Sequence, residues 1–301
     1  MNYIKISRVY NFKGDLVWIW VAGNAHHIFS FLYPLLFRRK KFFAQLGAVS
    51  INGSKFKRKI QNSIVRFSLL FYKNIGDNPH DTAGKLLIKT HKISENKIIP
   101  IKIGMPDYGF NEKDFNEMKL VYLGTLNGRE IWKSVKGLAI FTHKYPDIPI
   151  SYDLIGQGSR REVEMIMSEI RSSRLEHIVR YHGSLSVEQV KEVFSQCNIG
   201  VSYAPIRDYL ENSSTKTVEY FLAGMAVIGT NSYVMRKLVK KESGVLCEDN
   251  PENFSDALYL IQQNLKKYNS RVIRGIYEHY SIEYTIKNDY IIHLNKIIED
   301  K

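Results

Sequence analysis

The sequence predicts an α/β fold with parallel sheets, and three observations support that prediction. Short apolar runs, each bounded by glycine or polar turns, alternate with amphipathic helical stretches at roughly regular spacing, as successive βαβ units require. The apolar fraction of 44% is sufficient for a buried core. With 301 residues, the chain is long enough for two domains of ordinary size.

In the first hundred residues, apolar runs predict strands and helical periodicity predicts helices. We expect strands at 15–23 and 98–103, and helices at 55–73 (amphipathic) and 81–91. The aromatic stretch 25–37 ends in four basic residues. It is compatible with an interfacial segment beside anionic lipid and, equally, with a core helix that has a charged exit. Its shortness and Pro34 argue against a membrane span.

The remaining two thirds of the chain alternate more regularly. A polar stretch, 108–119, is predicted to be a linker. Strands are expected at 120–123, 151–155, 178–182, 199–201, 225–229 and 244–246. Helices are expected at 129–144, 160–171, 186–197, 217–223, 234–241 and 251–267. Ser186 with Gln189 fits a capping box, and Asn250 is a candidate N-cap.

Residues 202–231 contain the strongest functional signal. A polar loop, 207–216, follows one predicted strand and precedes a helix that ends at Gly224. Ligands of parallel sheets bind at the carboxyl ends of strands, beside helix N-termini. Glu219 would suit a pair of sugar hydroxyls, and Lys216 with free backbone N–H groups would suit a diphosphate. A capped surface helix with an ordinary glutamate is the alternative. Hydroxyl groups surround the helix start at Ser213, Ser214, Thr215 and Thr217.

The spacing from Glu211 to Glu219, followed by Tyr220, Ala223-Gly224 and Val227-Ile228, resembles a known signature. It is similar to the Glu-x7-Glu pattern of retaining glycosyltransferases of family 4 (glycosyl transferases group 1), which have the GT-B fold of two Rossmann-like domains. The resemblance covers about residues 120–290. It implies that Glu219 binds the ribose of a nucleotide and that Glu211 contacts the donor sugar. Glu-Asn-Ser-Ser stands here where many relatives have Glu-Gly-Phe-Gly.

The same resemblance implies further donor-binding residues. The turn at Gly124 and Thr125 and the basic residues Arg129 and Lys133 match a region that approaches the donor diphosphate, and Gly183 matches a glycine near the base. A glycine turn permits close backbone approach, and a guanidinium pairs well with phosphate oxygens. Exposed cations on a surface helix are the alternative. The other candidates for this site are Ser214 and Thr215, with Glu211, Lys216 and Arg129 in the catalytic roles.

We expect no cofactor and no metal, since Lys216 and Arg129 can neutralise the diphosphate of a UDP- or GDP-sugar. The His26-His27 pair lacks further ligands at metal-binding spacing.

The resemblance also implies the domain organisation. We expect a basic, acceptor-side N-terminal domain at 1–112, a nucleotide-sugar-binding domain at 113–279, and a C-terminal helix at 280–301 that crosses back to the first domain. The N-terminal domain is predicted to be incomplete, because the family's first glycine-rich loop has no counterpart. Gln45-Leu46-Gly47 stands where relatives often have a histidine.

Charge is distributed unevenly along the chain. The formal net charge is +13, and residues 1–100 hold this whole excess, with 17 basic and 4 acidic residues. Such a surface attracts phosphate-bearing partners, an anionic membrane among them. No nucleic-acid-binding motif accompanies it, so we expect no nucleic-acid partner. The two cysteines form no disulfide framework, and the N-terminus resembles no cleavable signal peptide, which favours a cytoplasmic protein.

The sequence therefore predicts a cytoplasmic, peripheral membrane glycosyltransferase that acts with retention. It would move a sugar from a nucleotide-sugar to a glycan or lipid-linked acceptor, in surface polysaccharide or lipopolysaccharide synthesis. The alternative is a catalytically impaired or truncated nucleotide-sugar-binding protein that acts with a partner. An epimerase acting on a UDP-sugar is a weaker alternative, because the sequence places no suitable histidine.

Overall fold

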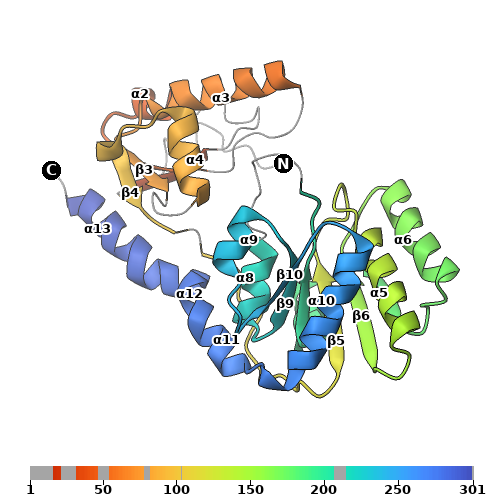
Figure 1. Cartoon of the computed structure of the whole chain (residues 1–301). Coiled ribbons are helices and arrows are strands. Elements are labelled where there is room, and N and C mark those ends of the chain that lie inside the picture. Colours follow the sequence, from red (N-terminus) through yellow and green to blue (C-terminus); the bar gives the residue numbers. More distant parts are fainter. Residues whose placement is uncertain are drawn as a thin grey trace. The chain divides into compact units, whose positions relative to one another are not determined.

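The structure is a computed structural model, and it describes residues 16–21, 32–46, 54–77, 82–102, 104–206 and 215–299. The chain divides into two compact units (Figure 1). The N-terminal unit comprises Met1–Gly104 with Ile282–Lys301, and the C-terminal unit comprises Met105–Ser281. The sequence analysis put the boundary after residue 112. Residues 105–112 also lie in the C-terminal unit, where Asn111 Nδ2 donates to Ser195 O (2.8 Å) and Arg274 Nη2 donates to Asp107 Oδ2 (2.7 Å).

The C-terminal unit contains a parallel sheet with strand order β10-β9-β8-β5-β6-β7. Counted from its first strand, this is the order 3-2-1-4-5-6 of dinucleotide-binding folds, with the reversal between β5 and β8. The strands match the apolar runs of the sequence because a parallel sheet is covered on both faces. They are β5 (Met118–Leu123), β6 (Ile150–Ile155), β7 (Val179–Gly183), β8 (Ile199–Ser202), β9 (Ala226–Thr230) and β10 (Gly244–Cys247).

Most of the predicted helices of this unit are confirmed. Ser186 and Gln189 form the predicted capping box, and the side chain of Asn250 accepts a hydrogen bond from Asn253 N. The predicted helix from residue 129 begins later, because Glu130 has φ +52° and cannot continue a right-handed helix. Figure 1 shows α5 and α10 side by side along the sheet. The helices are α5 (Trp132–Lys144), α6 (Arg160–Ser172), α7 (Val187–Gln196), α8 (Thr215–Leu222), α9 (Tyr233–Leu238), α10 (Pro251–Asn264), η3 (Leu265–Lys267), α11 (Ser270–Tyr277) and η4 (Glu278–Tyr280).

Tyr220 of α8 ties this helix to the centre of the sheet. The tyrosine is fully buried, and its Oη accepts a hydrogen bond from Leu123 N (2.8 Å) in β5. The ring lies directly on Gly200 of β8, where a Cβ atom would be 2.2 Å from the tyrosine Cγ. Only glycine at position 200 therefore allows α8 to pack this closely, and the packing fixes α8 at the point where the strand order reverses.

The N-terminal unit contains a second parallel sheet with the order β1-β2-β3-β4. Tyr290 anchors the C-terminal segment to this sheet, since its Oη donates to Gln45 Oε1 (3.2 Å) and its ring stacks on Trp18 at 5.0 Å. The elements are β1 (Leu16–Val21), α2 (Leu32–Leu36), β2 (Lys41–Leu46), α3 (Lys55–Leu69), β3 (Asn74–Asp77), α4 (Thr82–His91), η2 (Glu95–Lys97), β4 (Ile98–Pro100), α12 (Ile282–Thr285), the π-helical turn η5 (Ile286–Tyr290) and α13 (Ile291–Glu299).

Within the described residues, no helix combines the length and the apolar character that crossing a bilayer requires.

Candidate functional site

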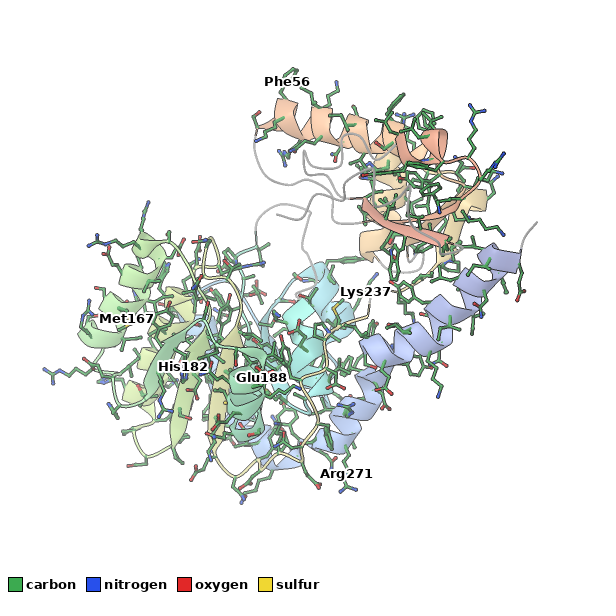
Figure 2. The ribbon with its side chains drawn as sticks, turned by 180° about the vertical axis from the view of Figure 1, so that it is seen from behind. Phe56, Met167, His182, Glu188, Lys237 and Arg271 are labelled. Atoms are coloured by element: carbon green, nitrogen blue, oxygen red, sulfur yellow. The ribbon has the colours of Figure 1, made fainter. Side chains whose placement is uncertain are left out.

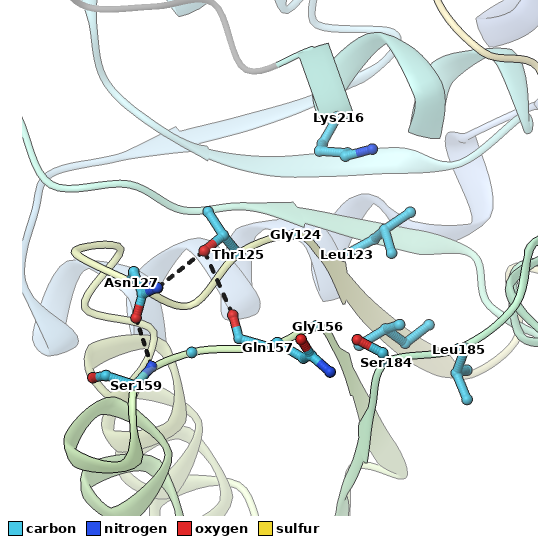
Figure 3. Close-up of a pocket in the computed structure, with 12 residues that line it drawn as sticks. Leu123, Gly124, Thr125, Asn127, Gly156, Gln157, Ser159, Ser184, Leu185 and Lys216 are labelled. Carbon is cyan, nitrogen blue, oxygen red and sulfur yellow. Dashed lines mark hydrogen bonds between the residues drawn. The ribbon is translucent and has the colours of Figure 1, made fainter. Parts of the chain in front are cut away.

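A cavity of about 620 Å³ lies in the C-terminal unit at the carboxyl ends of β5, β6 and β7 (Figure 3). This is the edge at which parallel sheets bind their ligands. Lys216 of α8 lines the cavity with residues from the turns after the three strands. The lining residues are Leu123, Gly124, Thr125, Asn127, Ile155, Gly156, Gln157, Gly158, Ser159, Ser184, Leu185 and Lys216.

Glycine makes the floor of the cavity possible. Gly156 has φ +147°, and a Cβ atom at this position would lie 1.7 Å from the carbonyl oxygen of Gly124. The turns after β5 and β6 are therefore in direct backbone contact. They are also hydrogen-bonded, since Leu126 N donates to Gln157 O (2.8 Å) and Ser159 N donates to Asn127 Oδ1 (2.6 Å). The floor is thus rigid and rich in backbone polar groups, as a phosphate-bearing ligand requires.

An ion pair between the half-buried Lys216 and the buried Glu219 stands at the start of α8. Lys216 Nζ donates to both carboxylate oxygens of Glu219, at 2.9 and 2.7 Å, and the Glu219 side chain is only 2% exposed. The side chain of Tyr108 is a further neighbour of Glu219 and contributes to lowering its pKa. Burial raises the pKa of Glu219, and the hydrogen bond and charge of Lys216 oppose that shift. A carboxylate can accept hydrogen bonds from two hydroxyl groups of a ligand, and the ammonium group of Lys216, which lines the cavity, can pair with an anionic group of the same ligand.

A second cluster of charges centres on Asp249, which follows β10. Its Oδ1 accepts hydrogen bonds from Tyr203 Oη (2.7 Å) and Lys133 Nζ (3.0 Å), and its Oδ2 accepts one from Ile206 N (3.2 Å). Lys133 also pairs with Glu130 at 2.8 Å. Partial burial lowers the pKa of Lys133, but its hydrogen bonds to Glu130 and Asp249 raise it by more. The cluster joins the start of α5 to residues 203–206, which follow β8.

Comparison with known families identifies the C-terminal unit. Residues 118–264 match the family described as glycosyl transferases group 1. This region is similar to the glycosyl transferases group 1 family. No curated protein sequence gives a significant match to the chain.

Solved structures extend the likeness over the whole chain. Anabaena HepE in complex with UDP aligns with a TM-score of 0.71 and 14% identity, covering 96% of this chain and 80% of HepE. A glycosyltransferase from Rickettsia africae aligns with 0.71 and 15%, covering 98% and 80% of the two chains. The apo form of WaaB, a lipopolysaccharide outer core galactosyltransferase, aligns with 0.59 and 19%, covering 96% and 79%. The chain has the GT-B fold, as the sequence predicted.

In the C-terminal unit, the structure brings several of the candidate residues together. Gly124, Thr125 and Lys216 line the cavity. Glu219 is bound to Lys216, and Gly183 (φ +68°) accepts a hydrogen bond from Gly156 N at 2.7 Å. Thr215 is the exposed first residue of α8. Glu211 and Ser214 lie outside the described residues.

Two basic candidates are not part of the cavity lining. Arg129 is exposed on the turn before α5. Lys133 points into the Asp249 cluster, where two carboxylates neutralise it. Within the described residues, no cluster of three His, Cys, Asp or Glu side chains is arranged to hold a metal ion.

Sequence reasoning missed several residues of the site. Tyr108 had been assigned to a linker, and nothing in its surroundings pointed to the carboxylate of Glu219. Asn127, Gln157 and Ser184 line the cavity from turns that were recognised only by their glycines. Asp249 could have been found, because an aspartate directly after a parallel strand lies at the ligand-binding edge of the sheet.

Proposed function

We propose that the chain transfers a sugar from a nucleotide-sugar to a glycan or lipid-linked acceptor, with retention at the anomeric carbon. The observation that carries this proposal is the ion pair of the buried Glu219 with Lys216 beside a glycine-floored cavity, within a region similar to group 1 glycosyltransferases. One carboxylate and one ammonium group suit the two ends of a nucleoside diphosphate, the ribose and the phosphates.

The proposed roles follow from the chemistry of each side chain. Glu219 accepts hydrogen bonds from the two ribose hydroxyls, because an ionised carboxylate is an acceptor only. Lys216 binds the diphosphate, and Arg129 on the turn after β5 adds a second cation. These cations stabilise the charge that grows on the leaving diphosphate in the transition state, so no metal ion is required. Glu211 orients the donor sugar, and Gly124, Thr125, Gly183, Ser214 and Thr215 complete the donor site. Lys133 acts through the Asp249 cluster.

The names of similar proteins support the substrate class. HepE has been solved with UDP, with UDP and glucose, and with UDP-glucose. WaaB is a galactosyltransferase of the lipopolysaccharide outer core. We infer a UDP-sugar as the first donor to test, ahead of a GDP-sugar. The proposed acceptor belongs to surface polysaccharide or lipopolysaccharide, whose synthesis begins at the cytoplasmic face of a membrane.

The first experiment is calorimetric titration with UDP, GDP and ADP. One nucleotide should bind the wild-type chain, and Glu219→Ala should weaken that binding tenfold or more, since losing hydrogen bonds to a charged acceptor costs about 1.5–3 kcal/mol. Glu192→Ala is the matched control, because Glu192 is an exposed glutamate on α7. Equal binding by the two variants, or no binding of any nucleotide, would contradict the proposed donor site.

The second experiment measures transfer. A glycosyltransferase releases a free nucleoside diphosphate when donor and acceptor are both present, and the product linkage, read by NMR, should have the anomeric configuration of the donor. A chain that binds nucleotide but gives no release with any acceptor is a nucleotide-sugar-binding protein that acts with a partner. A strict requirement for added divalent metal would contradict the proposed roles of Lys216 and Arg129.

A further inference from the structure

Helix α3 of the N-terminal unit has two apolar faces, and only one of them packs into the protein. The inner face contributes Val65 (4% exposed) and Leu69 (3%) to a core cluster that also contains Ile75 of β3 and Leu87 of α4. Ser54 caps the helix by accepting a hydrogen bond from Lys57 N, so the helix has a defined start. The inner face and the cap are sufficient to hold α3 in place.

The outer face of α3 carries large apolar side chains exposed to solvent. Phe56 is 74% exposed, Ile60 45%, Phe67 49% and Leu70 64%. Their spacing of four, seven and three residues puts them on one stripe of the helix, opposite Val65 and Leu69. Figure 2 shows the side chain of Phe56 pointing away from the rest of the unit. Single exposed apolar residues are ordinary, but an aligned stripe of this size marks an interaction surface.

Cations flank this stripe on both sides. Lys59 and Arg66 lie seven residues apart along one edge, Lys57 lies along the other, and all three side chains are exposed. Residues 16–76 contain ten lysines and arginines and no aspartate or glutamate. Nothing in this stretch therefore repels an anionic partner.

Helix α2 adds to the same surface chemistry. Its Tyr33, together with Phe37 just beyond its end, packs against the core cluster that holds α3, while Leu35 (39%) and Leu36 (57%) are exposed. The exposed Arg38 and Arg39 follow directly. Two neighbouring helical segments thus repeat one composition, in which exposed apolar side chains stand beside cations.

We propose that this outer face of α3, with the end of α2, docks the N-terminal unit on a membrane surface that contains anionic phospholipid. The apolar stripe would enter the boundary between headgroups and acyl chains, and the flanking lysines and arginines would contact lipid phosphates. An exposed helix face with a stripe of large apolar side chains and cations on both edges fits a fluid bilayer. The inference rests on α2 and α3 alone and does not depend on the proposed sugar transfer.

Co-sedimentation with vesicles tests the proposal. The probes are vesicles of phosphatidylcholine with phosphatidylglycerol and vesicles of phosphatidylcholine alone, each at low and high salt. The wild-type chain should bind the anionic vesicles, and salt should weaken the binding because it screens exposed charges. Flotation of the same mixtures separates true binding from aggregation.

Two triple variants divide the apolar and the ionic contributions. Replacing Phe56, Ile60 and Leu70 by Gln should lower the partition coefficient at least tenfold, since each side chain loses its transfer from water. Replacing Lys57, Lys59 and Arg66 by Gln should lower it about 100-fold at low salt, about fivefold for each cation. The exposed positions of the C-terminal unit supply matched controls, Val187, Leu260 and Val272 for the first triple variant, and Arg180, Lys191 and Lys266 for the second. Each control triple, also changed to Gln, should bind as the wild type does.

Each outcome decides the proposal. A wild-type chain that stays off anionic vesicles, or an apolar triple variant that binds as tightly as the wild type, overturns it. A wild-type dimer that the apolar triple variant converts to a monomer, without vesicle binding, would make the face a contact between two copies. All variants should retain wild-type affinity for nucleotide, so a failure here is distinguishable from failure of the donor site.

Discussion

The Asp249 cluster gives the most specific prediction about residues 203–206, which follow β8. Asp249→Asn keeps the shape of the side chain but removes its charge and turns one acceptor into a donor. At present one oxygen receives Tyr203 Oη and Lys133 Nζ, and the other receives Ile206 N. The one carbonyl oxygen of an asparagine can accept either from Tyr203 and Lys133 or from Ile206 N. Its NH₂ group then faces the remaining donors and cannot accept from them.

The magnitude follows from burial. The side chains of Lys133 and Asp249 are 19% and 20% exposed, so solvent screens their interaction only in part. Losing a charge-assisted hydrogen bond in such surroundings costs about 1.5–3 kcal/mol. Lys133 keeps Glu130 at 2.8 Å, which limits the loss. We therefore expect Asp249→Asn to lower the free energy of unfolding of the C-terminal unit by about 2 kcal/mol, and nucleotide affinity by severalfold.

Urea unfolding and hydrogen exchange measure the two effects separately. The amide of Ile206 should exchange faster in Asp249→Asn, because its acceptor is replaced, while the core strands β5 and β8 keep their order of protection. Asp256→Asn is the control, since Asp256 is exposed on α10. If Asp249→Asn unfolds within about 0.5 kcal/mol of the control and Ile206 exchanges at the wild-type rate, the cluster does not hold residues 203–206.

The remaining predictions concern the cavity. Burial raises the pKa of Glu219, and only the ionised carboxylate is a pure acceptor. On acidification, nucleotide affinity should therefore fall at a higher pH than it would with an exposed glutamate. Calorimetry across pH should show this fall in the wild type and a flat profile in Glu219→Gln. Gly156→Ala should cost more than about 2 kcal/mol of stability and abolish nucleotide binding, since its Cβ would lie 1.7 Å from Gly124 O. In thermal melts, the control Gly275→Ala should be neutral or stabilising, because a Cβ at that position would have no atom within 4 Å. Lys216→Gln should weaken UDP about tenfold while leaving uridine affinity nearly unchanged, and an equal loss for both ligands would refute a diphosphate role.

The sequence was sufficient for most elements of the C-terminal unit because its central strands are short apolar runs bounded by turns. Ile199–Ser202 and Ala226–Thr230 are fully buried strands, and the glycine that ends α8 has φ +80°. Local pattern did not reveal the late start of α5, because glutamate is not a residue type that marks a left-handed backbone, yet Glu130 has φ +52°.

The candidate site could be predicted only in part, for the same reason. Glu219, Lys216, Gly124 and Thr125 stand in recognisable local patterns. The sequence did not indicate that the ammonium group of Lys133, a candidate for the diphosphate, donates to Asp249. Asp249 is 116 residues away in the chain. Tyr108 meets Glu219 across 111 residues for a comparable reason: partners that are distant in sequence leave no spacing to read.

The pair of Lys216 and Glu219 has a consequence for ligand discrimination. Among the described residues, Lys216 and Glu219 each serve as the counter-ion of the other. A free phosphate ion that took Lys216 would strand a carboxylate that is 2% exposed, and would gain little. A nucleotide offers hydroxyl groups to the carboxylate at the same time as phosphates to the ammonium group, and so replaces both partners at once. The ion pair therefore favours a molecule that carries ribose and diphosphate together. It disfavours a free phosphate ion, which offers no hydroxyl groups to Glu219.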